Sequence, residues 1–297
     1  MLKFCASAGL AAMLLAGSVS SPAWAAGPGP GKADGTLRLD KAPTTLTQAY
    51  ALEVVELPEM RMPNSPERTI TLILTDRPLP GRVDDMSAME QAYNGQLRGL
   101  VIEIDPAAKT VVSGRTLIPQ DELPQYFSMS GDSSGVELTG FTDDKGIITG
   151  KIKTTAPMEV VNFDNKPGPK AYSFNVIFNA AVVPAPRLTA TLEGDQAKAS
   201  EQGQTLKRFL QAVADGNPDA LKAIVIKDHP ALTMLNPEGM GQLKEMIFAE
   251  GNNVDGIYAL LTKVYVYGQT ATVLLRHPDG WSSFPLALED GKWKMGY

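Results

Sequence analysis

The hydrophobic periodicity of the chain changes at one point, and this change sets what the parts on either side can fold into. Before Val183, apolar residues alternate with polar ones in short runs, which is typical of strands that bury one face. After Ser200, they recur at helical spacing. Pro184 and Pro186 separate the two patterns, and proline ends a strand and stiffens a connection. We therefore expect an all-β domain over residues 35–183, a linker over 184–200 and an α+β domain over 201–297.

The expected β domain consists of short runs rich in β-branched residues, separated by turn residues. The runs are 69–75, 97–104, 110–118, 136–141, 147–152 and 171–178. Asp105-Pro106 ends one run, and Thr142 to Gly146 forms a turn between two others. Strands at this spacing predict an antiparallel sandwich or barrel. A single short helix is expected over residues 86–93.

The N-terminal residues have the pattern of a secretory signal peptide. Lys3 supplies a positive charge, Leu10 to Ala16 is a short apolar run, and Ala23-Trp24-Ala25 is a small-x-small cleavage site. The apolar run is too short to cross a hydrocarbon core of about 30 Å. We expect residues 1–25 to be removed, residues 26–34 to be a flexible lead, and the protein to be periplasmic or secreted.

Composition excludes several classes of function. The chain has 27 basic and 33 acidic residues, a net charge of −6, and no basic run, which argues against nucleic acid or anionic lipid as a partner. The single cysteine, Cys5, lies in the expected leader, and there are only two histidines. We therefore expect no cofactor, no metal site and no stable membrane span.

The second part predicts three helices followed by a four-stranded antiparallel meander. Leu206, Phe209, Leu210 and Val213 form one apolar helix face, and Asn-Pro-acid signatures at residues 217–219 and 236–238 open two more helices. The expected strands are residues 257–267, 270–277, 281–288 and 292–297. Asp290-Gly291 is a preferred tight hairpin turn before the last of them.

Three segments of this second part resemble the NTF2-like (cystatin-like cone) superfamily. They are Phe209-Leu-Gln-Ala-Val-Ala-Asp-Gly-Asn-Pro-Asp-Ala-Leu221, Val264-Tyr-Val-Tyr-Gly-Gln-Thr-Ala-Thr-Val273 and Glu289-Asp-Gly-Lys-Trp-Lys294. The resemblance covers about residues 205–297. It implies a cone with a cavity between helices and sheet, but it does not imply catalysis. An extra strand between the second and third helices, found in larger members, is not evident.

Few residues suggest acid–base or nucleophilic chemistry. His229 and His277 are interpreted as a loop residue and a strand-end residue, although either could titrate near neutral pH. The Asp84-Asp85 and Asp143-Asp144 pairs are interpreted as turn residues. Ser130 to Gly135 only superficially matches a serine-protease motif, because no histidine precedes it after the leader.

The aromatic residues of the C-terminal strands give the candidate binding site. We expect Tyr258, Tyr265, Tyr267, Arg276 and Trp281 to line a ligand surface. The favoured function is non-enzymatic binding of a small apolar or mixed ligand, or of an envelope partner, through the C-terminal concavity. The alternatives are a structural module that forms a homodimer through its sheet, and a hydrolase or isomerase with its site in the cone.

Export generates the first testable prediction. Cleavage after Ala25 should leave Ala26 as the first residue of the protein in the cell envelope, because Ala23-Trp24-Ala25 fits signal peptidase. N-terminal sequencing of envelope-purified protein checks this. An exported protein that retains Met1 would contradict it.

Overall fold

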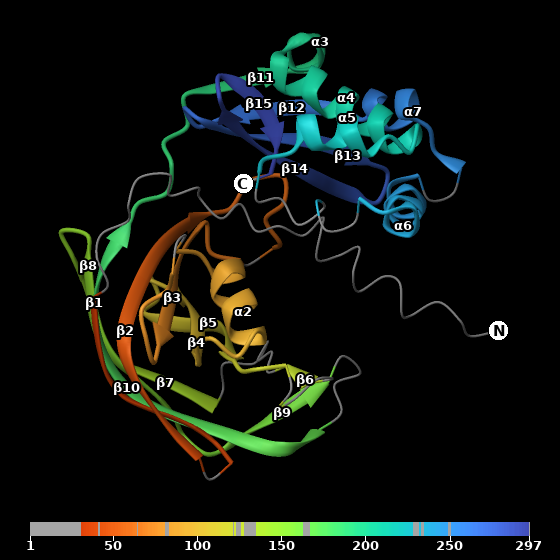
Figure 1. Cartoon of the computed structure of the whole chain (residues 1–297). Helices are drawn as coiled ribbons and strands as arrows, with labels where there is room; N and C mark the ends of the chain where they lie inside the picture. Colours follow the sequence, from red (N-terminus) through yellow and green to blue (C-terminus); the bar gives the residue numbers. More distant parts are fainter. Residues whose placement is uncertain are drawn as a thin grey trace. The chain divides into compact units, whose positions relative to one another are not determined.

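The computed structural model describes residues 31–40, 42–63, 65–80, 83–120, 122, 126–127, 135–162, 167–227, 232, 235–248 and 251–296. Two compact units divide the chain between Ala185 and Pro186. The first, called the β unit here, contains almost only strands, and the second, the α+β unit, contains helices and a separate sheet (Figure 1). The predicted class of fold is confirmed for both parts.

The β unit is built on one antiparallel sheet that curls. Its main path runs β5-β4-β3-β2-β1-β10-β8-β7, and the short strands β6 and β9 continue from β10. The elements are β1 (Gly31–Leu39), β2 (Ala42–Val55), β3 (Arg68–Thr75), α2 (Asp85–Tyr93), β4 (Gly99–Asp105), β5 (Thr110–Leu117), β6 (Tyr126–Phe127), β7 (Val136–Asp144), β8 (Ile147–Thr154), β9 (Met158–Asn162) and β10 (Pro167–Val183).

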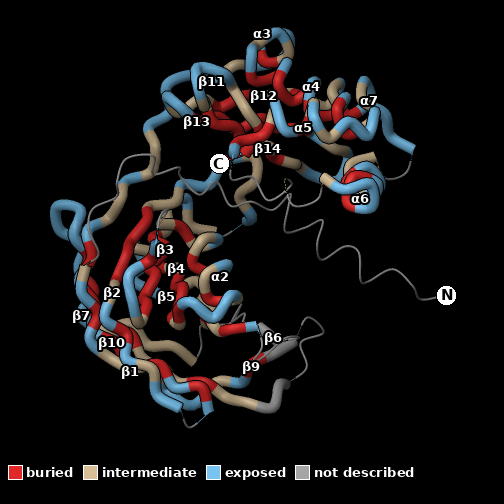
Figure 2. Tube along the Cα trace, in the orientation of Figure 1, coloured by how far each residue is buried: buried red, intermediate tan, exposed pale blue. Residues whose placement is uncertain are grey.

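The curl of this sheet lets its inner face pack against itself. Inward side chains from strands far apart in the path, among them Ile70, Ile102, Ile148 and Phe178, form one core cluster and are at most 1% exposed. Figure 2 shows the buried positions running along β2, β3 and β4. The two edge strands of the path, β5 and β7, approach each other without a backbone ladder between them. The sheet is therefore a half-barrel and not a closed barrel.

A β-bulge and a close backbone approach contribute to the curl. The register of β1 against β2 shifts between Lys32 and Gly35, and bulges bend a strand and increase its twist. A Cβ atom at Gly35 would lie 2.2 Å from the carbonyl oxygen of Asn175 on β10. Only glycine allows the two backbones to approach this closely here.

The one helix among the described residues of the β unit, α2, covers the outer face of β3, β4 and β5. Ala88 and Ala92 of α2 pack with Ile73, Val101 and Leu117, whose side chains point away from the inner core. Asp84, interpreted from the sequence as a turn residue, accepts a hydrogen bond from the Ser87 N–H (2.7 Å) and caps the helix. The expected helix over residues 86–93 is thus confirmed.

Among its described residues, the α+β unit has five helices and a five-stranded antiparallel sheet in the order β11-β12-β13-β14-β15. Its elements are β11 (Ala190–Glu193), α3 (Gly194–Ala199), α4 (Glu201–Ala214), α5 (Pro218–Ile224), α6 (Pro237–Ile247), α7 (Val254–Ala259), β12 (Leu261–Val266), β13 (Thr270–His277), β14 (Gly280–Glu289) and β15 (Lys292–Met295). The predicted caps are observed, because the side chains of Asn217 and Asn236 accept hydrogen bonds from the N–H groups of Ala220 and Gly239.

The boundaries differ from the sequence-based expectation in three places. Strand β1 begins at Gly31, inside the expected flexible lead. Strand β11 and helix α3 fill most of the expected linker, because the polar run over residues 190–199 forms an edge strand and a short surface helix. Residues 254–259 form α7 instead of the start of a strand, and the Asn253 side chain caps this helix at the Gly256 N–H.

The last strand is held on three sides. Asp290 and Gly291 have φ values of 54° and 72°, as the predicted tight turn requires. Met295 pairs with Leu286 of β14, and its carbonyl oxygen accepts a hydrogen bond from the Ile226 N–H at 2.9 Å. Trp293 packs on the core formed with α4, although it is only partly buried. Lys294 forms an ion pair with Glu289 at 2.5 Å.

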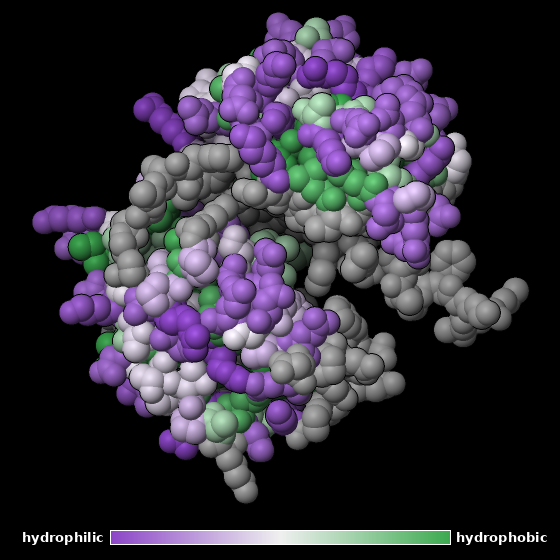
Figure 3. All heavy atoms as spheres, viewed as in Figure 1, coloured by the Kyte–Doolittle hydropathy of each residue, from purple (hydrophilic) through white to green (hydrophobic). Residues whose placement is uncertain are grey.

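No helix among the described residues is long and apolar enough to cross a membrane. Hydrophilic residues make up most of the coloured surface visible in Figure 3.

Replacing the side chain of Met295 by alanine tests the packing of the last strand. Met295→Ala should destabilise the α+β unit by about 2–5 kcal/mol, because Met295 is 3% exposed inside the core and alanine leaves a cavity. Urea titrations followed by the fluorescence of Trp281 and Trp293, both in this unit, measure the change. Lys292→Ala, an exposed change on the same strand, should stay within about 0.5 kcal/mol. Equal losses in the two variants would show that the strand does not pack as described.

Candidate functional site

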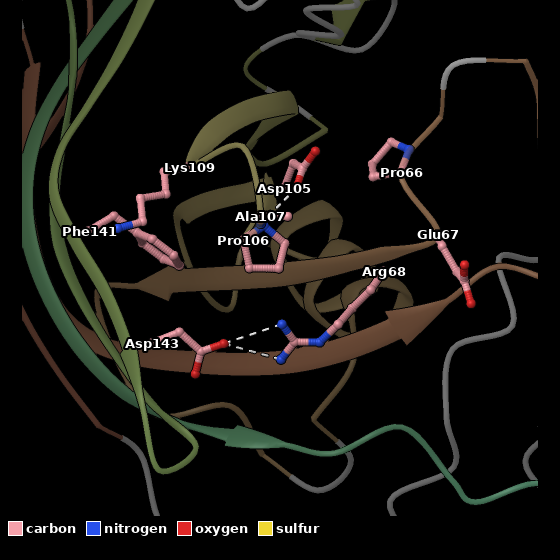
Figure 4. A pocket seen from close by; sticks show the side chains of 9 residues that line it. All are labelled: Pro66, Glu67, Arg68, Asp105, Pro106, Ala107, Lys109, Phe141 and Asp143. Carbon is pink, nitrogen blue, oxygen red and sulfur yellow. Dashed lines mark hydrogen bonds and ion pairs between the residues drawn. The ribbon is translucent and has the colours of Figure 1, made fainter.

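A hollow of about 520 Å³ lies at one end of the half-barrel. Three elements distant in sequence line it: the start of β3, the turn between β4 and β5, and the end of β7 (Figure 4). The lining residues are Pro66, Glu67, Arg68, Asp105, Pro106, Ala107, Lys109, Phe141 and Asp143. We call this region the hollow.

The position of the hollow follows from the inward face of the strands. Phe141 is buried in the inner core, and Asp143 lies two residues further along β7, on the same face. Arg68 likewise lies two residues before the buried Ile70 of β3. The polar side chains therefore begin where the apolar core of the half-barrel ends.

Arg68 joins strands from two parts of the curled sheet. Its Nε donates to Glu53 on the neighbouring strand β2. Both terminal nitrogens donate to Oδ2 of Asp143 on the edge strand β7, at 3.2 Å each (Figure 4). Because β3 and β7 are not neighbours in the sheet, this ion pair links strands that no backbone ladder joins.

Glu53 carries this network to the end of the β unit. Its second oxygen accepts a hydrogen bond from the N–H of Ala185 at 2.9 Å, next to the boundary between the units. Burial opposes ionisation of Glu53, but the hydrogen bonds from Arg68 and Ala185 and the charge of Arg68 outweigh it, so the pKa of Glu53 is lowered. The hydrogen bond to Glu53 also raises the pKa of Arg68, so the pair is charged at neutral pH.

The turn between β4 and β5 forms the opposite wall. Oδ1 of Asp105 accepts hydrogen bonds from the N–H groups of Ala107 and Ala108, which fixes the turn. Lys109 closes the turn with a φ of 55° and forms no ion pair with any described residue. Pro106 of this turn, Pro66 before β3 and Phe141 of β7 add apolar surface to the lining of the hollow.

The residues predicted from the sequence as a ligand surface do not converge. Tyr258 lies on helix α7, where its hydroxyl donates to the carbonyl oxygen of Lys198 (2.5 Å) and accepts from Gln204 (3.0 Å). Burial raises the pKa of Tyr258. These bonds tie α7 to α3 and α4, so in this structure Tyr258 joins three helices together.

The other four predicted residues lie on strands of the sheet or directly beside one. Tyr265 and Arg276 alternate with the core residues Val264 and Leu275, so they face away from the helices. Trp281 is paired directly with Arg276, whose guanidinium carbon lies 5.4 Å from the centre of the indole ring. Tyr267 lies just beyond β12 and donates its backbone N–H to Thr270. The structure therefore brings Arg276 and Trp281 together, away from the concave face.

The concave face of this sheet is occupied by the unit's own helices. Leu206, Leu210 and Val213 of α4 pack with the sheet residues Val264 and Val273, and all five are fully buried. The concavity in which the sequence analysis placed the site is therefore filled with aliphatic side chains at these positions.

Of the two histidines in the sequence, the structure describes His277. His277 ends β13 as predicted, and its buried Nε2 has no hydrogen-bond partner among the described residues. His229 and residues 130–134 of the serine-rich loop lie outside the described residues. Among the described residues, no group of three or more histidine, cysteine, aspartate or glutamate side chains could hold a metal ion.

Sequence reasoning missed both halves of the Arg68–Asp143 pair. Asp143 was assigned to a turn over residues 142–146, whereas β7 continues to Asp144 and only Lys145 and Gly146 have the positive φ values of a tight turn. The alternation of Phe141 with Asp143 was the available signal that Asp143 faces inward. Arg68 stands one residue before the run recognised as a strand.

Comparison of the chain with models of protein families, with curated proteins and with solved structures finds no match. The fold and the site therefore have to be interpreted from their own geometry.

Removing the charge of Glu53 should change the pH dependence of stability. A carboxyl group whose pKa is lowered in the folded protein stabilises it above the ordinary value of 4.5, and this contribution is lost as pH falls through the lowered pKa. Glu53→Gln should cost about 1–2 kcal/mol at pH 7 and flatten the loss of stability in acid. Urea titrations at several pH values, read by hydrogen exchange of peptides from β2 and β3, measure this.

Glu67→Gln is the matched control. Glu67 lines the same hollow, but its side chain is 76% exposed, so the same chemical change should be nearly neutral. A Glu53→Gln variant with the acid sensitivity of the wild type would contradict the assigned network.

Proposed function

We propose that the protein is a non-enzymatic binding protein and that its ligand site is the hollow at the end of the half-barrel. The observation that carries this proposal is the geometry of the hollow: about 520 Å³, with an apolar wall beside fixed charged groups. Ligand sites in proteins are typically concave, partly apolar and equipped with a few well-placed polar groups. The signal-peptide pattern supports a site of action in the periplasm or outside the cell.

The hollow is held in place before any ligand arrives. Arg68 is fixed by two carboxylates from two strands, and Asp105 is fixed by its own turn. A preorganised site loses less conformational entropy on binding, so a modest number of contacts gives useful affinity. This supports a binding role in the hollow over one in the C-terminal concavity, which is occupied by Leu206 and Leu210.

The charged groups of the hollow favour binding over catalysis. Arg68 is neutralised by Glu53 and Asp143, and the lining residues include no histidine, cysteine or serine. A general base needs a proton to accept within hydrogen-bond reach, and a nucleophile needs a neighbouring base. Neither pairing is present among the lining residues, so we favour a binding function over an enzymatic one.

We propose a structural role for the α+β unit, as a module of the NTF2-like type. Helices followed by an antiparallel sheet, and the Asp-Gly turn before the last strand, support this assignment. The single bridge between Val225 and Met295 stands where larger members have an extra strand.

Blocking the hollow tests the proposed site. Ala107 lines the hollow and is exposed, so Ala107→Trp should place an indole ring in it and abolish the binding of small molecules. A fragment library screened by ligand-observed NMR against the full chain provides the probes. Fragments that bind the wild type should lose their signal with Ala107→Trp.

Ala108→Trp is the matched control, because Ala108 is exposed in the same turn but does not line the hollow. This variant should bind the same fragments as the wild type. Fragments that bind Ala107→Trp as well as the wild type would move the site away from the hollow, and a library without any binder would overturn the proposal.

A further inference from the structure

The lining of the hollow carries charged groups of both signs: Arg68 and Lys109 lie with Glu67, Asp105 and Asp143. An anion that approaches Lys109 or Arg68 meets Asp105, Asp143 and the nearby Glu53. A cation that approaches Asp105 or Asp143 meets the ammonium group of Lys109 in the same lining, and Oδ2 of Asp143 is already paired with Arg68. Since Arg68 is already compensated by two carboxylates, its charge is not available to select an anion.

Hydrogen-bonding capacity nevertheless remains on both sides of the hollow. Arg68 has five N–H groups, of which three are engaged with Glu53 and Asp143. Asp143 uses only Oδ2 and Asp105 only Oδ1 in bonds to described residues, which leaves one carboxylate oxygen on each. Lys109 adds an ammonium group without an ion pair to the part of the chain that the structure describes. Donors and acceptors are therefore both free.

These free groups can also be reached from solvent. The side chain of Arg68 is 39% exposed and that of Asp143 is 26% exposed. In Figure 4 the Arg68 guanidinium points toward Asp143, Pro106 lies beside it in this view, and Lys109 lies next to Phe141. A ligand in the hollow would therefore meet charged hydrogen-bonding groups beside Pro106 and the apolar wall.

A hydroxyl group is the chemical group that fits this combination, because it both donates and accepts while remaining neutral. Hydrogen bonds from hydroxyl groups to charged side chains are stronger than those between neutral partners. A sugar ring carries several such hydroxyl groups and also has an apolar C–H surface that can pack on proline.

We propose that the hollow binds a neutral polyhydroxylated ligand, a sugar unit, through Asp143, Arg68, Asp105 and Lys109, with Pro66 and Pro106 beneath the ring. This inference rests on the proposed function, since it names the ligand class for the same site. Asp143 is the group that determines specificity, because it both positions Arg68 and offers a free oxygen to the ligand.

Binding to three classes of probe tests the ligand class. Isothermal titration of the full chain would use cellobiose, maltose and N,N′-diacetylchitobiose as neutral probes, decanoate as an anion and spermidine as a cation. At least one disaccharide should bind the wild type and fail to bind Ala107→Trp. Decanoate and spermidine should not bind in the hollow, so any binding that they show should be the same for the wild type and Ala107→Trp.

The same titration with two aspartate variants tests the role of Asp143. Asp143→Asn should weaken disaccharide binding about tenfold or more, as expected for losing a hydrogen bond to a charged group. Asp144→Asn, an exposed neighbour that does not line the hollow, should leave the affinity unchanged. Hydrogen exchange of peptides from β7 verifies that both variants are folded.

The outcomes separate this inference from the proposed function. Fragments or charged probes that bind in the hollow while all the disaccharides fail would overturn the sugar proposal and leave the binding site standing. Disaccharide binding that is insensitive to both Ala107→Trp and Asp143→Asn would overturn the sugar assignment to this hollow. If neither the fragments nor any of the titrated probes bind the wild type, both the sugar proposal and the proposed binding function are overturned.

Discussion

The architecture of the β unit depends on an apolar face that a curled sheet packs against itself. Strands that are remote in the sheet order contribute to one core, so the core exists only when the sheet is bent. Burial of such side chains is worth roughly 1.5–3 kcal/mol each, so the core stabilises the bent form of the sheet. Where this core ends, Arg68 links β2, β3 and β7 through two carboxylates. Apolar burial and one ion-pair network thus hold together a sheet whose edges are not joined by a backbone ladder.

The hollow is a consequence of this incomplete closure. In a fully closed small barrel, side chains fill the interior. Here the turn between β4 and β5 and the end of β7 approach each other without pairing, and the polar ends of inward-facing strands meet between them. The same residues therefore serve two purposes. They compensate each other's charge, which stabilises the half-barrel, and they keep part of their hydrogen-bonding capacity for a ligand.

The α+β unit buries its apolar side chains in a different way. Its helices lie on one face of the sheet, and α4 alone buries Leu206, Leu210 and Val213 against it. Tyr258 is part of this arrangement through its hydrogen bonds to two other helical segments. The aromatic residues that looked like a binding surface are distributed over a helix and the opposite sheet face. Aromatic residues in a sheet contribute to packing as well as to binding, so aromatic content alone does not locate a site.

Local sequence patterns determined the class of fold in both units, the division near Pro186, the helix caps at Asn217 and Asn236, and the turn at Asp290-Gly291. Each of these depends on backbone preferences or on periodicity within a few residues, which a sequence displays directly. The polar run over residues 190–199 was misread as a linker, because its strand forms only by pairing with β12. Only the tertiary structure could bring Arg68, Asp105 and Asp143 to one hollow, since their proximity depends on how far the sheet curls. That curvature is the sum of twist and bulges over many strands, and no local pattern encodes it.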